Sequence, residues 1–155
     1  MIFKKNCVLS LDKFIDEALY NKTLGYYMKG NPFGEKGDFI TAPNISILFS
    51  EMIGVWVVSF WESLNSPKQF NLIELGAGNG EMMTILTGVF NKFPQFNSSC
   101  NIKILEKSKH LKKIQKQKIN NHKVKWLDDL KDLNNLPCIF IANEFFDALP
   151  IKQFI

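Results

Sequence analysis

The chain has 155 residues, a net charge of +4 and 46% hydrophobic residues, so it can build one core, and a disordered chain is excluded. The three cysteines, Cys7, Cys100 and Cys138, are odd in number and far apart, which excludes a disulfide framework and a C-x-x-C pair and predicts reduced thiols. The two histidines, His110 and His122, each adjoin a lysine and no other metal ligand, so no metal site is predicted.

Residues 1 to 66 are predicted to form an N-terminal helical and loop cap. No apolar stretch typical of a signal peptide follows Lys4 and Lys5, and a packed helix is predicted by the spacing of Leu11, Phe14, Ile15, Ala18 and Leu19. The glycines and prolines between Gly30 and Pro43 predict a long functional loop.

The most apolar stretch runs from Met52 to Trp61. It is far shorter than the roughly 20 residues that span a bilayer. We expect a buried helix that begins near Ile45, and the alternative is a docking face for a partner.

The most informative stretch is FNLIELGAGNG, from Phe70 to Gly80. The apolar residues before the glycines predict a buried parallel strand, and the residues from Glu81 onwards predict the start of a helix. Glycine allows positive φ and lets a ligand approach the backbone closely. A strand, a glycine turn and a helix in this order form one side of a nucleotide pocket.

The spacing of the glycines discriminates between nucleotides. Glu81 stands where a G-x-G-x-x-G dinucleotide motif would need glycine or alanine, and no Gly-Lys-Ser/Thr exists for a P-loop. The remaining pattern, E-x-G-x-G-x-G from Glu74, resembles motif I of the class I S-adenosyl-L-methionine methyltransferases, in which the turn faces the methionine and sugar parts of the cofactor. For this motif alone, the alternative is a tight turn in another α/β protein.

A second strand is predicted over Ile102 to Leu105 and ends at Glu106, after a polar loop from Asn91 to Asn101. A carboxylate at the tip of a second strand can accept both ribose hydroxyls of a nucleoside. The alternative for Glu106 is a solvated charge among lysines.

Nine lysines and one acid lie between Lys103 and Lys125, so this segment carries +8 and the rest of the chain −4. Nucleic-acid binding is one interpretation. However, no aromatic residue lies between Lys107 and Lys118 to stack on bases. Leu111, Ile114 and Ile119 form only the narrow apolar stripe of a surface helix. We therefore predict no nucleic-acid partner. The chain contains no arginine, so lysine or backbone N–H groups must hold any cofactor carboxylate.

Two further strands are predicted, over residues 123–127 and 138–142. The second ends at Asn143, with Glu144 and Asp147 close behind. Because ligands bind beyond the carboxyl ends of parallel strands, these three residues are predicted to lie beside the transferred group. Glu144 or Asp147 can accept a proton from a nucleophilic nitrogen. The alternative is a helix N-terminus stabilised by acids.

Three segments, GDFITAP at 37–43, ELGAGNG at 74–80 and NEFFDALP at 143–150, together resemble the MidA family. These are S-adenosyl-L-methionine-dependent methyltransferases that include a mitochondrial complex I assembly factor, which methylates protein arginine. The resemblance implies methyl transfer to a nitrogen of an unidentified protein substrate, with arginine as the expected acceptor. It implies a place in the cofactor site for Gly37, Asp38, Thr41, Glu74, Gly76, Gly78, Gly80 and Glu106, and one beside the reacting centre for Asn143 and Glu144.

The chain also departs from the family, which often has proline and arginine at the positions of Ala77 and Asn79 and an acid at that of Asn44. Family members are much longer, and their sheets have more strands than the four predicted here. We expect an α/β, Rossmann-like class I methyltransferase sheet with helices on both faces, truncated after about four strands. Residues 67–155 would form this partial domain. The alternative function is an inactive fragment, or half of a split enzyme that acts with a partner chain carrying the C-terminal half.

The resemblance also bears on the compartment. The expected location is the cytoplasm in a bacterium, or the mitochondrial matrix if the source is eukaryotic.

Overall fold

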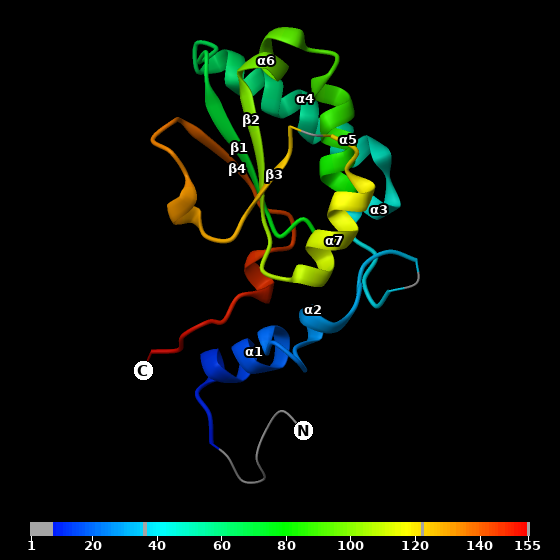
Figure 1. Cartoon of the computed structure of the whole chain (residues 1–155), viewed down its shortest axis with the longest axis vertical. Coiled ribbons are helices and arrows are strands. Elements are labelled where there is room, and N and C mark those ends of the chain that lie inside the picture. The colour runs from blue at the N-terminus through cyan, green and yellow to red at the C-terminus, as the bar shows by residue number, and fades with distance from the viewer. Residues whose placement is uncertain (1–7, 36, 122, 155) are drawn as a thin grey trace.

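The computed structural model describes residues 8–35, 37–121 and 123–154, so Cys7 and His122 lie outside the described residues. A four-stranded parallel sheet with the order β3-β2-β1-β4 forms its centre (Figure 1). The strands are β1 Phe70–Leu75, β2 Cys100–Leu105, β3 Lys125–Leu127 and β4 Cys138–Ile141. All four predicted strands and the α/β fold class are therefore confirmed.

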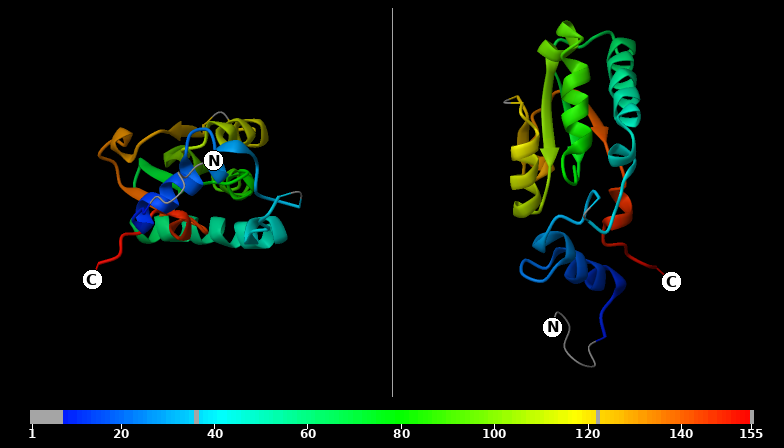
Figure 2. Two further views of the ribbon diagram at one scale, coloured as in Figure 1. Left: turned by 90° about the horizontal axis from the view of Figure 1, so that it is seen from below. Right: turned by 90° about the vertical axis from the view of Figure 1, so that its right-hand side faces the viewer.

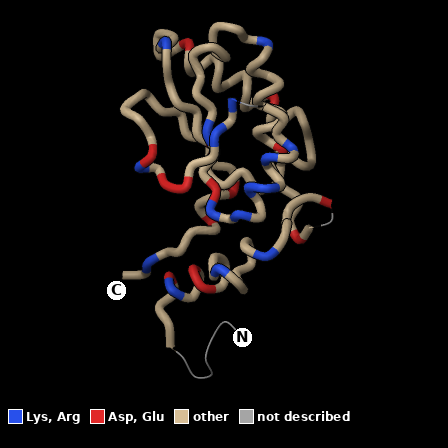
Figure 3. Tube along the Cα trace, viewed as in Figure 1, with Lys and Arg blue, Asp and Glu red and all other residues tan. Residues whose placement is uncertain are grey.

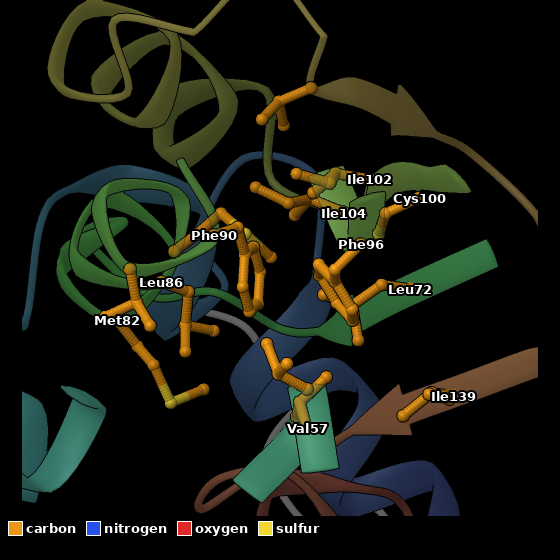
Figure 4. Close-up of a cluster of buried hydrophobic side chains, with 14 of the residues drawn as sticks. Val57, Leu72, Met82, Leu86, Phe90, Phe96, Cys100, Ile102, Ile104 and Ile139 are labelled. Atoms are coloured by element: carbon orange, nitrogen blue, oxygen red, sulfur yellow. The ribbon is translucent and has the colours of Figure 1, made fainter. Parts of the chain in front are cut away.

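Three helices cover one face of this sheet: α4 Ile47–Ser63, α5 Glu81–Phe90 and α7 Lys109–Lys118 (Figures 1 and 2). Their apolar side chains meet those of β1 and β2 in one core, and Figure 4 shows Leu86 and Phe90 of α5 in the same cluster as Leu72 of β1. Lysines gather along α7 (Figure 3), whose Leu111 and Gln115 are buried. A narrow buried stripe under a charged surface is what the sequence predicts for this helix.

The chain between β3 and β4, which contains the 3-10 helix η1 Leu130–Asp132, covers part of the opposite face of the sheet (Figure 1) and leaves Asn101 of β2 and Phe140 of β4 exposed. Asn71 of β1 is fully buried and donates from Nδ2 to Oδ1 of Asn134 in this segment, at 2.7 Å. Every residue of β1 is buried, as predicted for a central strand covered on both faces.

The sequence prediction for the residues between α5 and β2 is wrong. Instead of a polar loop over 91–101, the chain forms helix α6 Pro94–Ser99. Proline at the first helical position favours this start. Phe96 stabilises the helix because it is 1% exposed and its ring packs against that of Phe90, with the ring centroids 4.7 Å apart. A single aromatic among polar residues thus anchors the segment to the core.

The N-terminal elements are α1 Leu11–Tyr20, α2 Tyr26–Lys29 and α3 Ala42–Ile45. Helices α1 and α2 lie beyond the carboxyl ends of the strands (Figures 1 and 2). The predicted first helix is present, but none of its residues is buried. The predicted start of the long helix near Ile45 is two residues early, because the extended residue Ser46 separates α3 from α4.

The division of the chain at residue 66 stays a prediction, and α4 shares its core with the sheet. Within the described ranges, no helix has the length and apolar character that a membrane span requires. Cys100 and Cys138 are free thiols. The 3-10 helix η2 Phe146–Ala148 follows β4 and lies between the sheet and α1 (Figure 1).

Candidate functional site

The glycine turn after β1 adopts the backbone conformation that its sequence predicts. Gly76, Gly78 and Gly80 have φ values of 66°, 53° and 80°, a region in which other residues are strained. At Gly76, an added Cβ would also lie 2.7 Å from the ring of Phe145. The N–H of Gly76 donates to the carbonyl of Leu105 at 2.9 Å, which fixes the turn against the end of β2.

A pocket of about 360 Å³ opens beside this turn, at the carboxyl ends of the strands. Its walls come from the turn, the end of β2, the N-terminal segment and the residues after β4, and they include Tyr20, Tyr27, Phe33, Gly76, Gly78, Glu106, Asp128, Glu144 and Phe145. A smaller hollow of about 50 Å³ shares Phe33, Gly76, Gly78 and Glu144 with it and adds Thr41, Glu74 and Asn143. Seven of the predicted site residues thus line two adjoining cavities.

The remaining four predicted site residues line neither cavity. Gly80 lies behind the turn, where an added Cβ would contact Ile119 and Gln115. A Cβ at Gly37 would lie 2.3 Å from the Pro32 carbonyl oxygen, so this glycine is required by the loop itself. Asp38 accepts a 2.5 Å hydrogen bond from the Tyr26 hydroxyl and lines a separate hollow. Asp147 is exposed on η2.

Glu106 is 8% exposed and held by two neighbours. One carboxylate oxygen accepts from the backbone N–H of Ser108 at 2.9 Å, and the other accepts from Nε2 of Gln115 at 2.9 Å. Burial raises the pKa of Glu106, and these hydrogen bonds oppose that effect. The carboxylate is therefore fixed in position at the pocket wall, where its remaining lone pairs can accept further donors.

Glu74 at the end of β1 is 2% exposed, and its Oε2 has no hydrogen-bond partner among the described residues. Burial, with a further contribution from the charge of Glu106, raises the pKa of Glu74 to about 8. An ionised carboxylate at this depth needs a cationic or hydrogen-bonding partner. Glu74 lines the smaller cavity, so a ligand there can supply that partner.

An aromatic wall, which we define as Tyr20, Tyr27 and Phe33, closes the pocket from the N-terminal side. The ring centroids of Tyr20 and Tyr27 are 5.9 Å apart, and those of Tyr27 and Phe33 are 6.0 Å apart, with both pairs stacked. The Tyr20 hydroxyl donates to the carbonyl of Ala148 at 2.8 Å, and burial raises its pKa to about 12. Sequence analysis did not assign this wall to the site, although Tyr27 and Phe33 lie within ten residues before the first family-like segment.

After β4, Glu144 has a φ of 47°, a left-handed conformation that is uncommon for a residue other than glycine. This turn brings Glu144 to the boundary of the two cavities, and Asn143 lines the smaller one. Of the two predicted acids, the geometry brings Glu144 but not Asp147 to the pocket. Such strain at a pocket edge is typical of functional residues.

Asp128, at the end of β3, also lines the larger pocket and was missed by sequence analysis. It pairs with Lys112 of α7, whose hydrogen bond lowers the pKa of Asp128. The position of Asp128 directly after a short predicted strand was the signal that could have identified it as a site residue. Among the described residues, no cluster of three His, Cys, Asp or Glu side chains could hold a metal ion.

Comparison with solved structures shows the same architecture elsewhere. A protein from Burkholderia thailandensis, crystallised with S-adenosyl-homocysteine, superposes with a TM-score of 0.76 at 25% identity, covering 92% of this chain and 38% of that protein. A second crystal structure from the same organism gives a TM-score of 0.69 at 24% identity, with 93% of this chain covered and 36% of that one.

Curated relatives include the mitochondrial "Protein arginine methyltransferase NDUFAF7" of Xenopus laevis, 35% identical over 169 residues, and the protein of that name from Homo sapiens, 31% identical over 170 residues. These matches cover 94% of this chain but 39% and 38% of the relatives. The chain thus spans about two fifths of the length of the curated relatives it matches.

The sequence profile described as "Putative S-adenosyl-L-methionine-dependent methyltransferase" matches residues 52–155, which contain the whole sheet. The match covers more than half of the chain and includes both the glycine turn and Glu106. The chain therefore belongs to this family of S-adenosyl-L-methionine-dependent methyltransferases.

Proposed function

We propose that this chain binds S-adenosyl-L-methionine in the two adjoining cavities, and the observation that carries this proposal is the unpartnered, buried Oε2 of Glu74. The cofactor has a ribose diol and, in its methionine part, an ammonium group. Glu106 suits the diol as an acceptor, and the ammonium group would supply the cationic partner that Glu74 lacks. The family match and the solved structure that contains S-adenosyl-homocysteine support the same ligand.

Each wall of the pocket has its own task in this proposal. The glycine turn lets the ligand approach the backbone without steric hindrance. Leu105 and Leu111 provide an apolar end that suits a purine base. The aromatic wall excludes water from the side opposite the sheet. Gly37 and Asp38 then act indirectly, by shaping the loop that carries Phe33, whereas Thr41 lines the smaller cavity itself. Gly80 allows α7 to pack closely under the turn.

When bound, the cofactor supplies a methyl group on a positively charged sulfur. We propose that the acceptor is a nitrogen of a protein substrate, and specifically an arginine guanidinium, because the relatives carry the name of protein arginine methyltransferases. Glu144 can accept a hydrogen bond from that nitrogen and hold it in line with the methyl group. Asn143 can orient the same group, and Asp147 lies outside the pocket in this arrangement.

The experiment that tests cofactor binding is calorimetric titration with S-adenosyl-homocysteine. The unaltered chain should bind, and Glu106→Gln should bind at least about tenfold more weakly, because an amide cannot accept both hydroxyls. Glu62→Gln, an exposed change on α4, is the matched control. Absence of heat from the folded chain, both alone and together with a polypeptide equivalent to the remainder of its relatives, would contradict the proposal, and so would equal binding by Glu106→Gln.

We also propose a partner: a polypeptide equivalent to the part of the relatives that this chain does not span. Two adjoining surfaces support it. The outer edge of β4 pairs with no other described strand, and Phe140 on that strand is 48% exposed. Helix α4 packs at this side of the sheet, since its Val57 shares a core cluster with Ile139 (Figure 4). Its outer face is exposed and apolar, with Leu48, Met52, Val55, Trp56 and Phe60.

A patch of this kind marks a contact surface, and an unpaired strand edge invites another strand. The two interpretations of Met52 to Trp61, a buried helix and a docking face, therefore apply to opposite sides of one helix. Val57, Val58 and Trp61 are buried, while Met52 and Trp56 are exposed. Here the complementing half would complete the enzyme, whereas the alternative is a module that binds a partner without catalysis.

Co-expression with the remaining portion of a relative tests this partner. We expect the two polypeptides to co-purify, and Met52→Lys with Trp56→Lys to abolish co-purification, while Lys113→Glu on α7 leaves it intact. Titration of both forms with S-adenosyl-homocysteine then shows whether the partner is needed for binding. Sedimentation showing instead a dimer of this chain that the two lysine changes dissolve would contradict the proposal and identify a second copy as the occupant.

The compartment stays a prediction. The relatives are named as mitochondrial, and for this chain we propose the mitochondrial matrix if its source is eukaryotic and the cytoplasm if it is bacterial.

A further inference from the structure

Gln115 of α7 is fully buried directly behind the glycine turn, although it is a polar residue on a lysine-rich surface helix. Its Nε2 donates to the carbonyl of Gly78 at 2.9 Å and to Oε2 of Glu106 at 2.9 Å. Its Oε1 accepts from the indole Nε1 of Trp126 on β3 at 2.8 Å. One side chain therefore joins the turn, the end of β2 and strand β3.

The chemistry of the three partners permits only one orientation of this amide. The indole N–H is a donor without acceptor capacity, whereas the backbone carbonyl and the ionised carboxylate only accept. Oε1 must face Trp126, and both N–H groups of Nε2 must face the pocket wall. A flipped amide would place Oε1 of Gln115 against the carbonyl oxygen of Gly78 and the carboxylate of Glu106, with no hydrogen between them. Trp126 thus fixes the direction in which Gln115 presents its donors.

We propose that Gln115 is a positioning residue for the cofactor: it holds the Glu106 carboxylate and the Gly78 backbone in the geometry that accepts the ribose hydroxyls. This inference rests on the proposed cofactor binding and assigns a role to a residue outside the pocket lining. Gln115 touches no ligand in this arrangement and acts through Glu106 and the turn. Groups that orient a binding residue typically affect affinity strongly when they are removed.

The close packing of α7 supports a positioning role. An added Cβ at Gly80 would lie 3.4 Å from Cα of Gln115, so the helix backbone contacts the turn directly. The hydrogen bond from Gln115 also favours the ionised form of Glu106 against the effect of burial. Geometry and charge state of the ribose acceptor therefore depend on the same amide.

The first test replaces Gln115 by leucine in whichever form, alone or with the complementing polypeptide, binds S-adenosyl-homocysteine. We expect affinity to fall about tenfold or more, since both donors to the site are lost. The matched control is Gln117→Leu, an exposed glutamine on the same helix, which should bind like the unaltered chain.

A 2′-deoxy analogue of S-adenosyl-homocysteine separates positioning from a general structural effect. If Gln115 acts through the ribose acceptor, the unaltered chain should prefer the hydroxylated ligand, and Gln115→Leu should lose most of that preference. Equal weakening of both ligands would overturn the inference, as would unchanged affinity. No binding by the unaltered chain, either alone or with the complementing polypeptide, would overturn the cofactor proposal as well, so the two failures are distinguishable.

Gln115→Glu provides an isosteric second variant in case the leucine form does not fold. One oxygen of its carboxylate can still accept from Trp126. The other replaces the Nε2 donor, so it faces the acceptor oxygens of Glu106 and of the Gly78 carbonyl. Only the protonated acid restores one donor. Both forms contain Glu74, which must ionise to bind a cation, so the affinity of Gln115→Glu relative to that of the unaltered chain should rise as pH falls from 8 towards 6. Parallel pH profiles would contradict the positioning role.

Discussion

The two sides of the pocket are built in different ways. On the sheet side, Glu74 and Glu106 are buried, and the glycine turn is hydrogen-bonded to β2. Gln115 connects the turn to Glu106. On the N-terminal side, α1 has no buried residue. The aromatic wall is held by ring stacking, by a hydrogen bond from Tyr20 and by the ammonium group of Lys107 at 4.6 Å from the centroid of the Tyr20 ring. The sheet side is thus pre-organised for polar recognition. The N-terminal side supplies an apolar cover that contributes less to the stability of the fold.

The strongest way to break this comparison is to truncate one aromatic ring in the core behind the sheet side and one in the N-terminal segment. Phe96→Ala should lower the free energy of unfolding by about 3–5 kcal/mol, because its ring fills the core beneath α4 and α5. Phe39→Ala should cost about 1 kcal/mol or less, since that ring is 44% exposed. Urea denaturation measures both, and similar losses would show that the N-terminal segment is as tightly integrated as the sheet.

The second prediction concerns pH. Because the pKa of Glu74 is raised from an ordinary 4.5 to about 8, the folded chain holds a proton that the unfolded chain releases. Stability should therefore fall as pH rises from about 5 to about 8, by on the order of 2–4 kcal/mol, and then level off. Glu74→Gln should flatten most of this slope in denaturation curves. A slope that the substitution leaves unchanged would assign the effect to other groups, such as Glu106.

The third prediction concerns the turn. Gly76→Ala should destabilise the chain by about 1–2 kcal/mol for its left-handed backbone, with a further loss from the contact with Phe145. The matched control is Gly88→Ala in α5, where an added Cβ meets nothing within 4 Å and alanine should stabilise the helix by about 0.5–1 kcal/mol. The two substitutions should change the free energy of unfolding in opposite directions. Losses of equal size would show that the left-handed backbone at Gly76 is not the cause.

The smallest expected effect is that of Tyr20→Phe, which removes the hydroxyl that donates to Ala148 but keeps the stacked ring. Stability should fall by about 1 kcal/mol. Affinity for S-adenosyl-homocysteine should change little, because the apolar wall remains. A large loss of affinity with unchanged stability would instead assign the hydroxyl a direct role in the site.

Sequence alone predicted the strands, the glycine turn and the position of Glu106, because each depends on a local pattern of apolar residues and glycines. It did not predict α6, since one buried aromatic outweighs four polar neighbours there. It also missed the links made across the chain. The side chains of Gln115 and Trp126 are joined only once α7 and β3 pack together, and Tyr20 meets Ala148 across 128 residues. Spacing along one segment contains no signal for such contacts.

The site prediction likewise succeeded where it depended on a local pattern and failed where it depended on contacts across the chain. The residues that end strands, namely Glu74, Glu106, Asn143 and Glu144, all line the cavities, because parallel strands end at one edge of the sheet. Asp38 and Asp147 are turned elsewhere by the loops that carry them. The roles of all these residues stay predictions until binding is measured.

Calorimetry with S-adenosyl-homocysteine at pH 7, repeated in two buffers of different ionisation enthalpy, tests the central claim most directly. If the ligand's ammonium group pairs with Glu74, binding should release close to one proton, because a carboxyl with a pKa of about 8 is mostly protonated at that pH. Glu74→Gln should bind more weakly and release none. Binding with no proton release, and with the same affinity in Glu74→Gln, would contradict the account.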